Sequence, residues 1–377
     1  MGQKNHDKHV VPRWVQKKTS IKALSSSGLI SAVVDFSNWL HSAMFACAAM
    51  LEKGDNDAAL VVMCMYFRKR IQMLQTEGIQ TLHFVRDGAD LPAKFLTKQA
   101  REARAAANSS ASHTKREPWM EDGICRYFDG CNKVQQFSTI KVTWEVALFE
   151  ADAQIVHLLN LGYFHFAIAN DQDFSVFGAR RVASKLGRSP NKLNECDFLD
   201  TTEWKGKIPL CQQGSCTHPK SCGTCGKAVG LDRQGVLLAC VLAGTDYYPD
   251  GLKNVAISTA CDLIKKHCTI EAAVNAKLKI FARTNTAEAK HRTELLNNLH
   301  NARDTFLYQY VRTPTVNADG TMGDGTLSVD NITPAPPGVD TAGLSFLGSP
   351  PTVQVADDIA KGLRDPNPLQ QNLEQQQ

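Results

Sequence analysis

The sequence predicts an α/β fold in which a mostly parallel sheet is flanked by helices. Three short apolar runs, 29–35, 81–87 and 163–169, are typical of buried strands, and helical patterns separate them. Each run ends at or just before an acid, and these acids are Asp35, Asp87 and Asp171. Parallel strands end at a common edge of the sheet, which is where open α/β proteins build their sites.

Bulk composition is that of a soluble globular protein, with one elaborated domain or a domain with a tail. The 377 residues are 43% hydrophobic and 21% charged. No apolar run is long enough to cross a bilayer, and the polar, basic start lacks the apolar stretch of a secretory signal. We therefore expect an intracellular protein whose 12 cysteines are free thiols or metal ligands. A net charge of +4 permits an anionic partner.

Residues 36–54 and 58–77 are expected to form helices between the first two strands. Gly88 then marks a tight turn directly after Asp87. A lone aspartate after a strand commonly caps the next helix, so Asp35 and Asp87 each allow that interpretation. Their repetition at successive strand ends favours a shared site.

Residues 91–107 have strong helical propensity, and their cations fall on one side of the helix. Lys94, Lys98 and Arg101 share a face, with Arg104 beside it. This stripe is either an ordinary solvated face or a phosphodiester-binding surface, and its place after Asp87 favours the second. Residues 106–141 are poorly periodic, and we expect a flexible loop there.

The stretch 148–177 carries four acids in two pairs. Glu150 and Asp152 open a predicted helix, and Asp171 and Asp173 follow a predicted strand. Four carboxylates in one crevice repel one another unless cations fill it, and oxygen ligands suit Mg²⁺ or Mn²⁺. The alternative is two solvated loop ends.

A cysteine-rich insertion spans 211–226. Its cysteines could hold a structural zinc ion, with His218 as a spare ligand, or the segment could be a cysteine-bearing surface loop. The candidate zinc ligands are Cys211, Cys216, Cys222 and Cys225.

The last third begins with an apolar helix at 234–243, after which Asp246 is the seventh acid at the end of an element. Further helices are expected at 252–268 and 285–312. Residues 313–352 are rich in Pro, Gly, Thr, Asp and Ser, which predicts a linker with little packed structure. A short docked helix is expected at 356–365.

Several stretches resemble the catalytic core of the flap endonuclease/XPG superfamily of 5′ nucleases, and most of all its exonuclease 1 branch. They are VVDFSNWLH, FVRDGADLPAKFLTKQAREAR, FEADAQ, the DQD of 171–173, LAGTDY, NARDTFLYQYV and DDIAKGLRDPNP. The resemblance runs from about residue 30 to residue 367. It implies a PIN-like (5′-nuclease) fold with a helical arch at 91–141 and a degenerate helix-hairpin-helix at 246–268.

The resemblance also implies roles for individual residues. Two Mg²⁺ or Mn²⁺ ions would be held by Asp35, Asp87, Glu150, Asp152, Asp171, Asp173 and Asp246. Lys94 and Arg101 would contact the scissile phosphate, and His41 would stack on the terminal base. Lys98, Arg104 and Lys253 would bind DNA. The implied partner is DNA with 5′ ends, flaps or gaps.

This chain departs from the family pattern at three places. MGQKNHDKH replaces an apolar start that wedges the duplex, and Arg86 replaces an aromatic residue, which places a cation next to the acids. Asn254, Val255 and Ala256 replace a Gly-Ile-Gly hairpin with one residue extra. Their Cβ atoms should hinder the approach of a phosphate, so we expect a weakened grip on the downstream duplex.

We expect four regions: a variable basic N-terminus (1–28), an N-terminal nuclease region (29–178), an internal region (179–312), and a linker with a C-terminal wrap (313–377). The leading hypothesis is a structure-specific 5′ nuclease that acts on DNA in the nucleus, with no membrane association. Two alternatives stay open: a DNA-binding scaffold with little turnover, and an RNA-directed 5′ nuclease. No segment identifies a protein partner.

Overall fold

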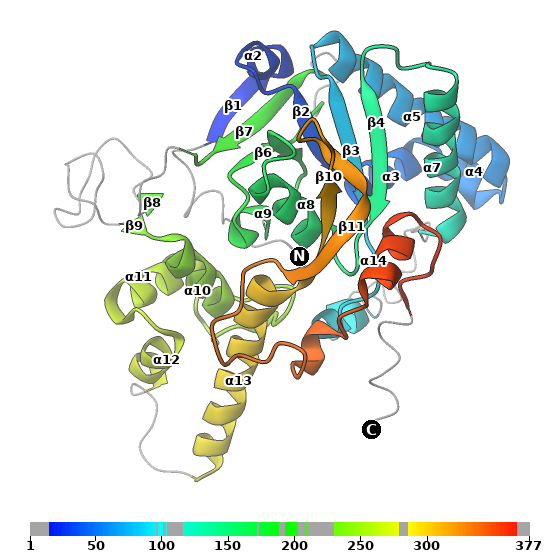
Figure 1. The fold of residues 1–377 in the computed structure, drawn as a ribbon. Helices are drawn as coiled ribbons and strands as arrows, with labels where there is room; N and C mark the ends of the chain where they lie inside the picture. The colour runs from blue at the N-terminus through cyan, green and yellow to red at the C-terminus, as the bar shows by residue number, and fades with distance from the viewer. Residues whose placement is uncertain are drawn as a thin grey trace.

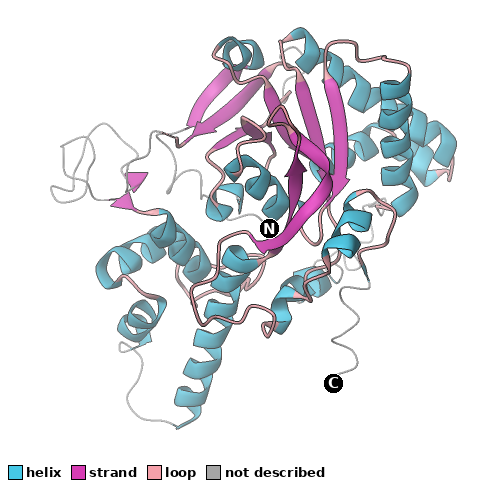
Figure 2. Cartoon of the chain, in the orientation of Figure 1, coloured by secondary structure: helices cyan, strands magenta, loops and turns pink. Residues whose placement is uncertain are grey.

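A computed structural model describes residues 15–95, 97–100, 103, 116–171, 173–187, 193–202, 208–209, 230–278 and 286–367. A seven-stranded sheet lies at its centre, with helices on both faces (Figures 1 and 2). Its strands are β1 (Val15–Ser20), β2 (Ser31–Asp35), β3 (Thr81–Arg86), β4 (Lys141–Val146), β5 (Phe166–Ile168), β6 (Arg181–Ser184) and β7 (Glu195–Asp200). Within the described residues, no helix is both long and apolar enough to cross a membrane.

The strand order is β1-β7-β6-β5-β2-β3-β4. The five strands from β6 to β4 are parallel, and β7 pairs antiparallel with β6 and β1. The chain proceeds outward from β2 to β4 and then returns to β5 on the other side of β2. Such a reversal opens a crevice beyond the carboxyl ends of the two neighbouring strands. The predicted α/β fold is confirmed.

Successive side chains of a strand point to opposite faces of the sheet, so the sheet packs against two separate hydrophobic cores. Val34 and Phe84 face a layer formed by α3 (Phe36–Ala46), α5 (Asn56–Thr76) and α7 (Pro118–Lys133), beside the shorter α2 (Ile21–Ser26) and α4 (Ala48–Glu52). Val33 and Val85 face the opposite layer. That layer contains α8 (Ala151–Asn160), α9 (Asp173–Phe177), α10 (Arg233–Ala243), α11 (Ile257–His267), α12 (Ile270–Leu278) and α13 (Thr286–Tyr308).

The expectation of a flexible loop over 106–141 is wrong for its second half. Residues 118–133 form helix α7, in which Met120, Ile124 and Phe128 are buried at helical spacing. Phe128 stacks on Phe84 of β3, with ring centroids 4.9 Å apart. The Ser- and Lys-rich sequence before Pro118 hid this amphipathic period. Residues 104–115 lie outside the described part of the chain.

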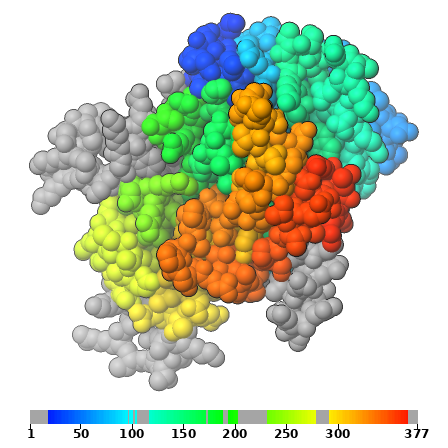
Figure 3. Space-filling model, viewed as in Figure 1, coloured from blue at the N-terminus to red at the C-terminus, as the bar shows by residue number. Residues whose placement is uncertain are grey.

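The expectation of a linker at 313–352 is also wrong. Residues Tyr310–Val316 (β10) and Met322–Asn331 (β11) form an antiparallel hairpin. The hairpin lies in front of the sheet, and α14 (Val353–Ala360) lies next to β11 and the end of β4 (Figures 1 and 3). A third apolar cluster, which includes Leu148, Leu347 and Ile359, joins this segment to the end of β4. The Gly and Thr residues form a two-stranded ribbon whose packing comes from its neighbours, which composition alone does not predict.

Candidate active site

Acids from separate elements follow the strands and helices that meet at the carboxyl end of the sheet. Asp35 ends β2 and caps α3, accepting a hydrogen bond from the Asn38 amide at 3.2 Å. The helix-capping interpretation and the shared-site interpretation therefore both hold for this residue. Asp87 follows β3, and Glu150 and Asp152 open α8 after β4. Asp171 follows β5, Asp173 opens α9, and Asp246 follows α10.

Mutual electrostatic effects show that these acids form one cluster. Burial and then the charge of Asp87 raise the pKa of Asp35 to about 7. Burial and then Asp171 and Asp246 raise the pKa of Asp173 to about 8. The pKa of Asp152 is raised by burial, by Asp171 and by Asp35. That the seven acids converge on one metal site stays a prediction.

Asp87 is the best-satisfied acid of the cluster. Its Oδ2 accepts hydrogen bonds from Ser37 Oγ at 2.7 Å and from Arg116 at 3.1 Å, and its Oδ1 accepts from the Ala151 amide at 3.1 Å. Against partial burial, the Arg116 guanidinium lowers the pKa of Asp87. Asp87 therefore stays ionised, in contrast to Asp35 and Asp173.

Glu150 is held by two donors on a single oxygen. Lys94 Nζ lies 2.6 Å from Glu150 Oε2, and Tyr247 donates its hydroxyl hydrogen to the same oxygen at 2.9 Å. Gln309, at the end of α13, donates to the Tyr247 oxygen at 2.8 Å. Lys94 Nζ also lies 5.4 Å from the centre of the Tyr247 ring. Although burial opposes it, Glu150 raises the pKa of Lys94, so this amine stays protonated.

The cluster fits hard divalent cations by its chemistry. Its donors are carboxylate oxygens, which suit Mg²⁺ and Mn²⁺, and buried Asp173 Oδ1 has no hydrogen-bond partner among the described residues. Over the same residues, no three His, Cys, Asp or Glu side chains converge tightly enough to form a ready-made metal site. Lys94 and Arg116 supply positive charge at Glu150 and Asp87 in this state. The ligand assignment stays a prediction.

The other predicted residues have different positions. His41 is exposed on α3, with its ring 4.8 Å from that of Phe45, and Lys253 is exposed just before α11. Lys98 is paired with Asp90. Arg101, Arg104 and the candidate zinc ligands Cys211, Cys216, Cys222 and Cys225 lie outside the described residues.

The expectation that Arg86 places a cation next to the acids is wrong. Its guanidinium instead contacts α7, with Nε 2.9 Å from Glu121 and NH1 3.0 Å from Asp122. The cation beside Asp87 is Arg116, which sequence reasoning missed because it lies in the stretch assigned to a loop. Tyr247 was also missed, although its place directly after Asp246 was a signal.

The hairpin before α11 adapts to its unusual sequence. Asn254 has a φ of +60°, in the left-handed region that favours glycine. Val255 is buried in the core, whereas Asn254 and Ala256 are exposed. Only those two side chains can therefore hinder a phosphate there. The weakened grip on duplex DNA stays a prediction.

Comparisons with known proteins agree with this arrangement. Residues 141–246 match the family model of the XPG I-region. Exonuclease 1 of Danio rerio is 25% identical over 350 residues, which cover 90% of this chain and 39% of that protein. Exonuclease 1 of Drosophila melanogaster is 27% identical over 294 residues, which cover 75% of this chain and 36% of that protein. The chain thus spans little more than a third of the length of these relatives.

A solved structure titled as the catalytic core of Rad2 in complex with DNA substrate has the same fold. It superposes with a TM-score of 0.52 at 19% identity, over 81% of this chain and 86% of the other. The shared fold, the matched I-region and the relatives along most of the chain agree. The chain carries a match to the XPG I-region and is similar along most of its length to exonuclease 1 proteins.

Proposed function

We propose that this protein is a divalent-metal-dependent, structure-specific 5′ nuclease that hydrolyses phosphodiester bonds in DNA. It would cut in the 5′→3′ exonucleolytic sense and also at 5′ flaps, in DNA repair, replication or recombination in the nucleus. The observation that carries this proposal is the set of seven acids at the carboxyl end of the sheet, in which burial and neighbouring acids raise the pKa values of Asp35, Asp152 and Asp173. Asp173 and Asp246 are buried among these acids, and like charges placed together in this way have no structural advantage unless cations join them.

Asp35, Asp87, Glu150, Asp152, Asp171, Asp173 and Asp246 would hold two Mg²⁺ or Mn²⁺ ions. Such ions supply Lewis-acid chemistry, which activates a water molecule and stabilises a departing oxygen. Among the chain's own groups, protonated Lys94 can offset negative charge on the phosphate. The exposed His41 ring can stack on a terminal base regardless of its identity, which suits recognition of DNA shape.

The decisive experiment uses 5′-labelled recessed and 5′-flap duplexes with Mg²⁺ and with EDTA. We expect Mg²⁺-dependent release of short 5′ products, and no products from Asp173→Ala. Asp324→Ala, an exposed acid on the C-terminal hairpin, is the matched control and should cut like the unchanged protein. Binding of flap DNA without cleavage in either Mg²⁺ or Mn²⁺ would exclude the nuclease and favour a scaffold.

The same assay discriminates between DNA and RNA. Metal chemistry at the phosphate does not depend on the sugar, so the 2′-hydroxyl decides preference through contacts elsewhere. We expect matched DNA duplexes to be cut faster than RNA duplexes of the same shape. Faster cutting of RNA would replace the proposed substrate with a 5′ RNA end.

A further inference from the structure

We propose that Arg116 is a further substrate-binding cation of this active site, held in place by Glu121, and that its target is a phosphate of the strand to be cut. This inference rests on the proposed nuclease function.

A series of ion pairs connects the end of β3 to the acid cluster. Arg86, at the end of β3, places NH2 2.7 Å and Nε 2.9 Å from Glu121 Oε2 on the first turn of α7. The other oxygen of Glu121 accepts a hydrogen bond from Arg116 Nε. Arg116 NH1 then reaches Asp87 Oδ2 at 3.1 Å. One buried carboxylate therefore joins two guanidinium groups.

The exposed fractions of these four side chains show which of them are buried and which can reach a ligand in solvent. The Arg86 and Glu121 side chains are 12% and 8% exposed. Those of Arg116 and Asp87 are 36% and 43% exposed. Arg86 and Glu121 thus form an internal anchor, and the Arg116 guanidinium opens to solvent at the edge of the crevice.

Guanidinium geometry makes this arrangement suited to phosphate. The group is planar, stays charged and presents five N–H donors in a fixed fork. Nε donates to Glu121 and NH1 donates to Asp87, so the other N–H groups of Arg116 can donate to a second ligand. Divalent ions bound at Asp87 would offset its charge; a phosphate would then be the better partner for Arg116, and Glu121 would keep the guanidinium within reach.

Arg116→Gln, which removes the charge at similar length, tests the inference. Binding of 5′-flap DNA would be measured with Mg²⁺ in the Asp173→Asn background, so that no DNA is cut. We expect a loss of about 10- to 100-fold, as for other charged hydrogen bonds. The slope of the logarithm of the binding constant against the logarithm of the salt concentration should become shallower by about 0.7–0.9, which is the value for one phosphate contact. Arg116→Lys, which keeps the charge, should restore part of the affinity.

Arg126→Gln is the matched control, because Arg126 is also an arginine, lies on α7 shortly after Arg116 and is exposed. We expect it to bind within about twofold of the unchanged protein, which is the usual range for a surface substitution. Glu121→Gln should give a partial loss, and the Arg116→Gln/Glu121→Gln double variant should be no worse than Arg116→Gln alone. A loss in Arg126→Gln equal to that of Arg116→Gln would overturn the inference, because it would indicate a general basic surface.

A second readout separates phosphate binding from mere neutralisation of Asp87. The melting temperature of each variant would be titrated with Mg²⁺ in the absence of DNA. Unchanged DNA binding together with a lower Mg²⁺ midpoint in Arg116→Gln would overturn the inference, because Arg116 would then only stand in for a metal ion. If the unchanged protein neither binds nor cuts flap DNA, the proposed function itself fails. If it does both and Arg116→Gln matches it, only this inference fails.

Discussion

In two regions of the molecule, the pKa values of buried carboxyl groups are shifted in opposite directions. In the active site, burial and neighbouring acids raise the pKa of Asp173 to about 8. Beneath the C-terminal hairpin, Glu145 of β4 is just as buried, yet against burial Arg312 lowers its pKa to about 2. The difference is the partner: Asp173 has acids around it, and Glu145 has a guanidinium and an imidazole.

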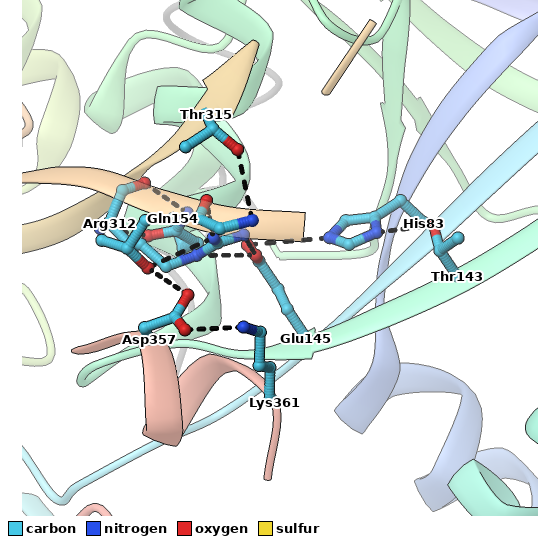
Figure 4. A network of polar contacts seen from close by, with 10 residues as sticks. His83, Thr143, Glu145, Gln154, Arg312, Thr315, Asp357 and Lys361 are labelled. Carbon is cyan, nitrogen blue, oxygen red and sulfur yellow. Dashed lines mark hydrogen bonds and ion pairs between the residues drawn. The ribbon is translucent and has the colours of Figure 1, made fainter. Parts of the chain in front are cut away.

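The second region is a network of polar contacts around Glu145 and Arg312 (Figure 4). Arg312 of β10 binds Glu145 through Nε at 3.1 Å, and His83 Nε2 lies 3.6 Å from the other Glu145 oxygen. Gln154 of α8 exchanges two hydrogen bonds of 2.8 Å with the Arg312 backbone. Buried charges are costly unless paired in this way. A carboxylate paired with cations therefore holds segments together, whereas Asp173, which lies among other acids, would be stabilised by a bound cation.

The largest predicted effect is on cleavage and follows from a change at Asp173 in the active site. Asp173→Asn should lower the cleavage rate by at least about 1000-fold, because it removes a metal ligand and its charge. It should also stabilise the metal-free protein at pH 8 by roughly 1 kcal/mol or more, since about one pKa unit corresponds to 1.4 kcal/mol. Gel assays and urea unfolding would measure the two quantities.

The pH dependence of stability in the unchanged protein provides a sharper test. A carboxyl group with a raised pKa in the folded state lowers the stability of the protein as pH rises. For Asp173 the loss extends from the pKa of the unfolded state, 3.8, toward that of the folded state, about 8. The metal-free protein should therefore become less stable across this window, and Mg²⁺ should reverse the trend by binding the folded state. If the stability of the metal-free protein did not change with pH, the raised pKa of Asp173 would be contradicted.

The next effect, in the paired network, is on stability. Arg312→Met should destabilise the fold by about 3–5 kcal/mol, because it leaves Glu145 buried and uncompensated. In the unchanged protein, the lowered pKa of Glu145 contributes stability that is present above pH 4.5 and is lost as pH falls toward about 2. The variant should lack this contribution. Arg364→Met, an exposed arginine, is the control and should unfold like the unchanged protein.

A smaller effect is expected at Tyr247, which joins the site to α13. Tyr247→Phe keeps the ring and its contact with Lys94 but removes the hydrogen bond to Glu150, which should cost about 1–2 kcal/mol. We expect the Mg²⁺ concentration for half-maximal cleavage to rise about 5- to 30-fold, with little change in kcat at saturating metal. Tyr248→Phe, the next residue, is the matched control. An equal loss in both variants would indicate a packing effect.

The sequence predicted the first region far better than the second. Asp35, Asp87 and Asp171 follow apolar strands, and the parallel sheet that those strands form brings them to one edge. The Arg312–Glu145 pair joins residues 167 positions apart, and no local period marks either of them. Arg116 was missed for a similar reason, since its role depends on α7 packing against β3. Local patterns reveal elements and their ends, whereas contacts between distant segments require the fold.

The smallest effect should arise at the solvent rim of the network. Lys361 pairs with Asp357 on α14 at 2.6 Å, but its side chain is 43% exposed. Exposed pairs one helical turn apart contribute only about 0.3–0.5 kcal/mol because water and salt screen them. Lys361→Met should therefore change the free energy of unfolding by less than about 1 kcal/mol, and the difference should vanish in 1 M salt, where the screening length is about 3 Å. A loss as large as that of Arg312→Met would show that the rim and the buried pair act as a single unit, and the contrast between paired and unpaired carboxylates would then extend to the surface.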